Sequence, residues 1–233
     1  MVDISHLFCP PEIQDLSLRL PSRTHCLLLS DSLSLSSLFL GAVAGTSESS
    51  SGEMTINGYD FSKNPNEYRR LLGYSDRRTC FDPAVTVREL LFFTGEIKKI
   101  PYQKLTRSVA ELLDRFGMKE KLSSSIGSLS KTELFRLKVV QARLGNPELI
   151  ILDNPFSDWE AKEIETETAN LHEACSENTL LVSTTQKDLS NNWGFSSVYC
   201  LKKDSLEERN LPAPINETPE PPEKEEIKDD SAL

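Results

Sequence analysis

The chain has 233 residues, of which 38% are hydrophobic and 27% are charged, the composition of a soluble globular protein with one sizeable core. Its formal net charge of −10 and the lack of a Lys/Arg cluster argue against direct binding to nucleic acid or to an anionic membrane surface. The five cysteines are scattered and include no C-x-x-C pair, so we expect neither a disulfide framework nor a zinc site, which fits a reducing cytoplasm.

The first clear unit is a strand, a loop and a helix. "HCLLL" (His25–Leu29) reads as a buried strand, and "LFLGAVAG" (Leu38–Gly45) reads as the first turns of an apolar helix. Nucleotide-binding proteins usually place a glycine-rich phosphate cradle between two such elements. The intervening loop, "SDSLSLSS" (Ser30–Ser37), contains no glycine and no lysine. The sequence thus keeps the position of a phosphate site without its usual residues.

A stretch rich in helix follows. The segments 86–99, 102–117 and 131–145 carry apolar residues at three- and four-residue spacing, which is typical of amphipathic helices. Ser130 precedes the third segment and Glu133 follows three residues later, so the pair predicts a capping box. We expect these helices to form an inserted lobe over about residues 82–146.

Two further apolar runs complete the core. "ELIILD" (Glu148–Asp153) and "TLLVST" (Thr179–Thr184) are short and apolar on both faces, which is typical of central parallel strands covered by helices on both sides. The alternation of such strands with helices predicts an α/β fold over residues 1–201.

The composition changes at about Lys202. Residues 202–233 are dense in Pro and Glu, and they contain no aromatic residue. Such a segment cannot bury enough apolar surface to offset the entropy lost on ordering, so we expect a disordered acidic tail. An extension that aids solubility is favoured over a specific docking segment.

The order of these segments resembles the nucleotide-binding subunit of an ATP-binding cassette (ABC) transporter, closest to the drug-export subgroup. The resemblance implies a P-loop NTPase-like core with an antiparallel β arm and an inserted helical subdomain. It rests on several segments in order and spacing. These are "SGEMTINGYDFSKNPNEYRRLLGYSD", "TVRELLFF", "GSLSKTELFRLKVVQARLGNPELIILDNP" and "LVSTT".

The resemblance allows the serine-rich loop to be compared with the family's phosphate-binding pattern, GxxxxGK[ST]. Ser30 and Leu35 stand where that pattern has glycine, and Ser36 stands where it has lysine. Ser37 keeps the hydroxyl at the magnesium-ligand position. Glycines let backbone amides turn toward the phosphates, and the lysine supplies positive charge. We therefore expect a degenerate nucleotide site.

Most other positions that handle nucleotide in the family are also changed. Asp153 keeps the magnesium-orienting carboxylate, but Asn154 replaces the general-base glutamate, and an amide cannot accept a proton from water. The signature LSGGQ appears as "LSKTE" (Leu129–Glu133), which keeps Ser130 but loses both glycines. The remaining changes are Arg77 for the glutamine that links nucleotide to the membrane partner, Glu160 for the D-loop aspartate and Thr185 for the switch histidine.

These changes predict a catalytically inactive ABC ATPase-like subunit with a structural or regulatory role and with no cofactor, catalytic residue or metal of its own. The resemblance implies a membrane permease subunit and an intact ABC ATPase subunit as partners, at the cytoplasmic face of a membrane. Direct insertion is not expected, because no apolar run approaches the roughly 20 residues that span a bilayer. Two alternatives stay open: weak binding of ATP and magnesium at a composite site completed by an active partner, and a soluble scaffold outside transport.

The resemblance also places a short helix of the membrane subunit in the groove between the core and the helical lobe. Arg77, Arg78 and Phe81 lie there, and buried arginine and aromatic residues often dominate protein interfaces. We expect these three residues to belong to the docking surface.

Several conspicuous residues are expected to have no site chemistry. Trp159 and Trp193 are interpreted as packing residues rather than platforms for adenine. Phe8, near the family's adenine-stacking aromatic, is also assigned to the core. The histidines, His6, His25 and His172, show neither ligand nor catalytic spacing.

Overall fold

The computed structural model describes residues 1–47, 51–78, 81–186 and 192–209, and its centre is a six-stranded sheet. The strand order is β10-β9-β3-β8-β7-β6, and every neighbouring pair is parallel except β10 with β9. Buried residues on both faces are the pattern of parallel strands covered on both sides. The strands are β3 His25–Ser30, β6 Leu72–Ser75, β7 Leu149–Leu152, β8 Thr179–Thr184, β9 Ser197–Lys202 and β10 Ser205–Arg209.

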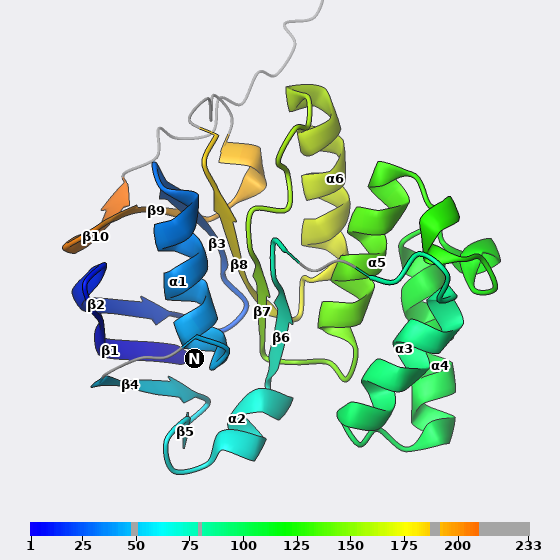
Figure 1. Cartoon of the computed structure of the whole chain (residues 1–233), viewed down its shortest axis with the longest axis horizontal. Helices are drawn as coiled ribbons and strands as arrows, with labels where there is room; N and C mark the ends of the chain where they lie inside the picture. Colours follow the sequence, from blue (N-terminus) through cyan, green and yellow to red (C-terminus); the bar gives the residue numbers. More distant parts are fainter. Residues whose placement is uncertain (48–50, 79–80, 187–191, 210–233) are drawn as a thin grey trace, which may run out of the picture.

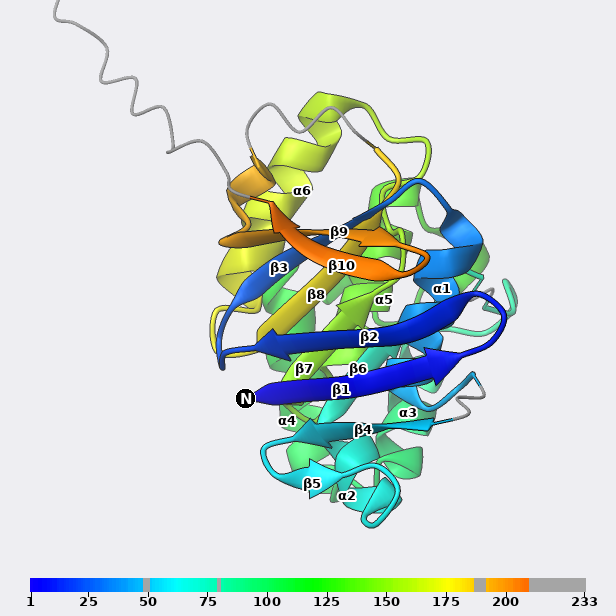
Figure 2. The ribbon, with the colours of Figure 1, turned by 90° about the vertical axis from the view of Figure 1, so that its left-hand side faces the viewer.

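A second, four-stranded sheet is antiparallel and has the order β2-β1-β4-β5. It is the β arm that the resemblance implies, and Figure 2 shows it lying across the larger sheet. Its strands are β1 Val2–Cys9, β2 Ile13–Leu20, β4 Ser51–Ile56 and β5 Tyr59–Asp60.

Helices cover both faces of the larger sheet (Figure 1). The helix α1 lies between the two sheets, α5 and α6 cover the opposite face, and α3 and α4 form a lobe beside α5. This arrangement confirms the predicted α/β fold with an arm and a helical lobe. The helices are α1 Leu33–Ala44, α2 Pro65–Arg70, α3 Val87–Ile97, α4 Tyr102–Arg115, α5 Lys131–Arg143 and α6 Ala161–Ala174, with short 3-10 turns at η1 Lys119–Lys121, η2 Ile126–Ser128 and η3 Asn192–Gly194.

Two apolar clusters divide the core at the larger sheet. On β3, Cys26 and Leu28 face α1 and the arm, whereas Leu27 faces the cluster formed with α3 to α6. Successive side chains of a strand point to opposite faces, so one short apolar strand contributes to both clusters. This burial fixes the position of the loop that follows β3.

The helical lobe is joined to the core through α5. The predicted capping box is present at its start, where the Ser130 hydroxyl accepts a hydrogen bond from the Glu133 amide and the Glu133 carboxylate accepts one from the Ser130 amide. Near its other end α5 lies directly on β6: a Cβ at Gly73 would stand 2.0 Å from the Ala142 carbonyl oxygen. Glycine at this position therefore permits the close contact between lobe helix and sheet.

Two predicted boundaries differ from the structure. The helix expected from Leu38 begins at Leu33, because Ser32 caps it. The sheet continues past the predicted boundary at residue 201, since Ser205–Arg209 pair with β9 through backbone hydrogen bonds that do not require apolar side chains. The rest of the predicted tail, residues 210–233, lies outside the described residues. Among the helices that the structure describes, none is long and apolar enough to span a bilayer.

Candidate functional site

The predicted site residues gather at the edge of the larger sheet where the parallel strands end. Ser30 ends β3, Arg77 follows β6, Asp153 and Asn154 follow β7, and Thr185 follows β8. In open α/β sheets, ligands usually bind in the crevice outside this edge. What can bind here depends on the contacts that these residues already make.

The segment between β3 and α1 is a tight turn rather than an open loop. The Ser30 hydroxyl donates to the Ser32 carbonyl over 3.0 Å, and the Ser32 amide donates to the Ser30 hydroxyl over 3.2 Å. The Ser32 hydroxyl in turn accepts the Leu35 amide at 3.2 Å, and the Ser32 carbonyl accepts the Ser36 amide at 3.1 Å. In a phosphate cradle such amides face the ligand, whereas here they are bonded within the first turn of α1.

The side chains at the glycine and lysine positions are also turned inward. Leu35 is 9% exposed and belongs to the apolar cluster beneath α1. Ser36 is 1% exposed, and its hydroxyl donates to the Leu33 carbonyl over 3.1 Å. Neither side chain offers a charge or a donor to a phosphate group.

Asp153 is bonded to the chain's own hydroxyl groups. It is 2% exposed, and its two carboxylate oxygens accept hydrogen bonds from Ser37 Oγ at 2.6 Å and from Ser183 Oγ at 3.0 Å. Ser183 also accepts the backbone amide of Asn154 at 2.9 Å. The structure thus brings Ser37 and Asp153 into direct contact and links Asp153 to Asn154 through Ser183, a residue that the sequence analysis missed. A serine inside the apolar run of β8 was the available signal.

The remaining predicted positions are less directly connected. Asn154 is buried with a φ of 44°, so it occupies the left-handed region next to Asp153. Thr185 is half-buried and lines a separate hollow at the ends of β3, β8 and β9. Ser130 lies in the lobe, where its hydroxyl and its amide are both used in the capping box with Glu133. The structure therefore does not bring Ser130 into the cluster around Asp153.

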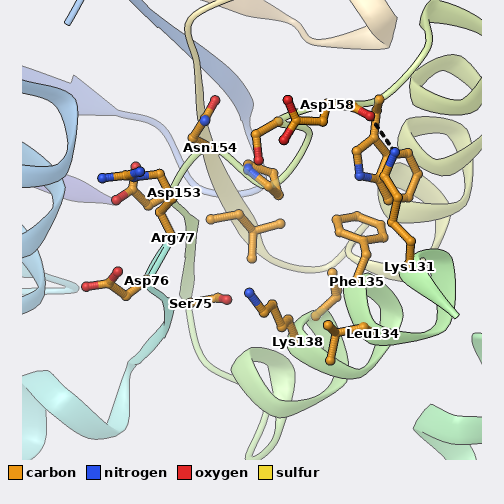
Figure 3. A pocket seen from close by; sticks show the side chains of 15 residues that line it. Ser75, Asp76, Arg77, Lys131, Leu134, Phe135, Lys138, Asp153, Asn154 and Asp158 are labelled. Carbon is orange, nitrogen blue, oxygen red and sulfur yellow. Dashed lines mark hydrogen bonds between the residues drawn. The ribbon is translucent and has the colours of Figure 1, made fainter. Parts of the chain in front are cut away.

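A cleft of about 450 Å³ opens between the sheet edge and α5 (Figure 3). Arg77 and Asp153 line its sheet side, and Lys131 and Lys138 project from α5 on the other side. Lys131 Nζ donates to the Asp158 carbonyl over 2.6 Å and lies 4.7 Å from the centre of the Trp159 ring. The cleft is polar at its rim and has an aromatic wall.

The three predicted docking residues differ in their surroundings. Arg77 is exposed and lines the cleft. Arg78 is exposed beside it, and its amide donates to the Asp76 carboxylate over 2.5 Å. Phe81 is partly buried and packs against the apolar cluster of the helices. Of the three, Arg77 is the residue that lines the cleft.

The tryptophans are packing residues, as predicted. Trp159 and Trp193 are 8% and 9% exposed, and both rings contact Phe156 edge to face. The assignment of Phe8 to the core was wrong, since it is 37% exposed. The pairing register of β1 shifts on either side of Leu7, so that Leu7 and Cys9 take the buried face and Phe8 points away from it.

The residues described by the structure contain no group of three or more His, Cys, Asp or Glu side chains that could hold a metal ion. A magnesium ion of the family's kind would be held by Ser37 and Asp153 together with nucleotide phosphates. In the structure these two side chains are hydrogen-bonded to each other.

The chain is similar in sequence to known ATP-binding proteins of transport systems. The family model described as ABC transporter matches residues 13–157. The molybdate/tungstate import ATP-binding protein WtpC of Thermococcus kodakarensis is 27% identical over 150 residues, which are 64% of this chain and 45% of that protein. The sulfate/thiosulfate import ATP-binding protein CysA of Mycobacterium tuberculosis is 27% identical over 202 residues, 85% of this chain and 57% of that protein. The chain thus spans about half the length of the curated relatives it matches.

Solved structures share the fold. The ATP-binding subunit of an ABC transporter aligns with a TM-score of 0.75 at 21% identity, covering 90% of each chain. A nucleotide-free ATP-binding cassette from an ABC transporter aligns with a TM-score of 0.76 at 14% identity, covering 90% of this chain and 91% of that one. At these identities the likeness establishes the fold alone.

The comparisons correct the expected subgroup. The sequence features had indicated the drug-export subgroup, but the relatives named above are import proteins. The segments used for that expectation surround the phosphate loop, the signature and the second Walker strand, which ABC ATPases share, so they carried little information about the direction of transport.

Proposed function

The chain belongs to the ABC transporter ATP-binding family, and from this premise we propose that it is a structural or regulatory subunit of a membrane-associated transport complex that does not itself hydrolyse ATP. The observation that carries the proposal is the tight turn at Ser30–Ser37, in which the amides of Leu35 and Ser36 are bonded inside α1. A phosphate group would have to break these bonds to be held there.

The expected loss of nucleotide affinity is large. A charge-assisted hydrogen bond of the kind that the missing lysine supplies is worth roughly 1.5–3 kcal/mol. Since 1.4 kcal/mol corresponds to about tenfold in affinity, the missing lysine alone would weaken binding about ten- to a hundredfold. The turn at Ser32 adds to this loss, because no inward amides replace the missing charge. The residues at this site do not fit a bound nucleoside triphosphate.

Hydrolysis would be impaired separately. Asn154 stands where a general base is expected, and its amide cannot take the proton of an attacking water. General-base assistance contributes roughly two to four decades in rate. Even a partner that completed the phosphate site would therefore gain little catalysis from this half of it.

A subunit that does not hydrolyse ATP can still contribute to transport by assembling with other subunits. The relatives are import ATP-binding proteins, so we place the complex among importers rather than exporters. A permease subunit and an intact ABC ATPase subunit are the partners that such a complex requires. We propose that the permease contacts the cleft lined by Arg77, Lys131 and Lys138, and that the chain is held at the membrane surface only through this contact.

Calorimetric titration of the full chain with Mg-ATP tests the nucleotide part of the proposal. We expect no binding with a dissociation constant below about 100 micromolar, a free energy near −5.5 kcal/mol. Ser36→Lys should not restore binding, because the Ser32 turn remains. Ser34→Lys, on the exposed side of the same helical turn, is the matched control for added charge. Tight binding by the unmodified chain would refute the proposal.

A further inference from the structure

Two histidines that are far apart in sequence meet at the other end of β3. His25 begins β3 and His172 lies near the end of α6, 147 residues later. Their Nδ1 atoms are 2.6 Å apart, which is a short hydrogen-bond distance. Both side chains are partly buried.

The two rings meet edge to edge. Their planes are inclined by 15° and their centroids are 4.8 Å apart. Since the Nδ1 atoms are much closer than the centroids, they lie between the ring centres, and a separation of 2.6 Å is too short for two rings stacked face to face. A proton carried by one Nδ1 would point directly at the other.

The outer nitrogens determine how many protons the pair carries. His25 Nε2 is 3.1 Å from the Cys175 carbonyl oxygen, and His172 Nε2 is 2.8 Å from the Trp193 carbonyl oxygen. A carbonyl only accepts, so both Nε2 atoms must donate and both carry a proton. The two Nδ1 atoms then need one proton between them. The arrangement holds three ring protons on two imidazoles, one more than two neutral histidines have.

The carbonyl that faces His172 is held there by an unusual turn. Trp193 and Gly194 adopt φ values of 45° and 80°, both in the left-handed region. A Cβ at Gly194 would lie 3.1 Å from the ring of His172, so the close approach of this backbone favours glycine. Phe195 packs edge to face against the same ring with centroids 4.7 Å apart. The backbone at Trp193–Phe195 is therefore fitted to this histidine.

Among the residues that the structure describes, few charged groups lie near the pair. On α6, Glu173 is exposed, and just after it the buried thiol of Cys175 is neutral, because burial raises its pKa to about 12. Before β3, the Arg23 guanidinium forms an ion pair with the Glu177 carboxylate, with a nitrogen–oxygen distance of 2.8 Å. The positive charges of Arg143 on α5 and Arg115 on α4 lower the pKa of Cys175, against the larger effect of burial. The described residues at Trp193–Phe195 include no titratable group, and the charge that acts on His172 is that of His25.

We propose that His25 and His172 share a single proton and act as a pH-sensitive latch that fastens α6 and the backbone at Trp193–Phe195 to the start of β3. Loss of the shared proton at high pH leaves two Nδ1 lone pairs facing each other. Gain of a second proton at low pH places two N–H groups and two positive charges in contact. The latch is closed between these limits. Burial lowers the pKa of both histidines, which opposes the shared proton as well as the second one, whereas the hydrogen bonds to the Cys175 and Trp193 carbonyls favour the protonated rings.

Nuclear magnetic resonance of the ring nitrogens of the full chain tests the latch, because the chain has three histidines. His25 and His172 should titrate as a coupled pair, in two separate steps, rather than as two independent groups. Between the steps both Nε2 atoms should carry protons, with one proton shared by the Nδ1 atoms. His6→Gln removes the signal of the exposed histidine and leaves the pair. A single ordinary titration for both residues, or two neutral rings throughout the range from pH 5 to 9, would overturn the proposal.

Stability gives a second measurement that does not depend on signal assignment. Because the pKa of both rings is lowered in the folded chain, the unfolded chain binds more protons at acidic pH, so the free energy of unfolding of the full chain should fall more steeply on the acidic side than that of His172→Gln, which has lost one of the two rings. His6→Gln should keep the pH dependence of the unmodified chain. Equal pH dependence in all three proteins would contradict the latch, and the titration of the unmodified chain decides the matter if His172→Gln does not fold.

Discussion

Asp153 is the family residue that this chain retains most fully, yet its contacts are those of a structural residue. Ser37 and Ser183 donate to its two oxygens, and Ser183 connects it to the backbone of Asn154. A buried carboxylate bonded in this way ties together the ends of β7 and β8 and the start of α1. Its retention does not by itself indicate catalysis.

Asp153→Ala separates the structural role from the catalytic one. Loss of the carboxylate leaves two hydroxyl donors without their acceptor in a buried site, so we expect the free energy of unfolding to fall by about 2 kcal/mol or more. The ATPase rate of the assembled complex should be unchanged, whereas the corresponding substitution in the intact cassette should abolish it. Thermal unfolding and turnover of the purified complex provide the two measurements. A lost ATPase rate with assembly intact would instead favour a composite site.

At the scale of elements, the sequence was most informative where one local pattern decided the structure. The capping box of Ser130 and Glu133 could be recognised because both partners lie within one turn. The start of α1 was missed because Ser32 is one of several serines in the segment and no glutamate follows at the third position. The strand β10 was missed because an edge strand such as "SLEER" needs only backbone pairing, and its side chains carry no apolar signal.

The end of α5 offers a pH-dependent test at the same scale. Lys98, just after α3, donates to the Leu144 carbonyl over 2.8 Å, and burial lowers the pKa of its amine to about 8. The unfolded chain therefore binds more protons than the folded chain between about pH 8 and pH 10.5, and stability should rise with pH across this window.

Denaturant unfolding of the unmodified chain and of Lys98→Met measures this effect. From pH 8 to 10.5 the free energy of unfolding of the unmodified chain should rise relative to that of Lys98→Met, by an amount on the order of 3 kcal/mol. Lys99→Met is the matched control, because Lys99 neighbours Lys98 in sequence but its side chain is exposed. This variant should show no such trend relative to the unmodified chain. A constant difference across the window would show that Lys98 remains charged in the folded chain.

At the scale of the whole molecule, the fold class followed from short apolar strands alternating with helices, but the contacts between distant segments did not. The pairing of His25 with His172 depends on a strand and a helix that only the tertiary fold brings together. The same holds for Ser183 beside Asp153, since β7 and β8 become neighbours only in the sheet. The exposure of Phe8 depends on a register shift in β1 that the alternation of residues does not reveal. Such features carry no local signal.

The cleft between the core and the lobe is the surface on which assembly should depend. Arg77 lines the sheet side of the cleft, opposite the residues of α5, and an arginine enclosed by a partner there could lose roughly 2 kcal/mol of binding free energy on truncation. This corresponds to about thirtyfold weaker association. Charge reversal should cost more, because it places a carboxylate near Asp76 and Asp153 as well as removing the guanidinium.

We therefore expect Arg77→Glu to release the chain from its complex, as measured by co-purification with the permease, while its melting temperature stays that of the unmodified chain. Arg70→Glu is the matched control, since it makes the same charge change on the exposed side of α2. Ser36→Ala should also co-purify normally, because Ser36 is buried within α1 and cannot reach a partner. If Arg77→Glu co-purifies at the normal level with an unchanged melting temperature, the cleft is not the docking surface, and the face toward a second cassette becomes the surface to test next.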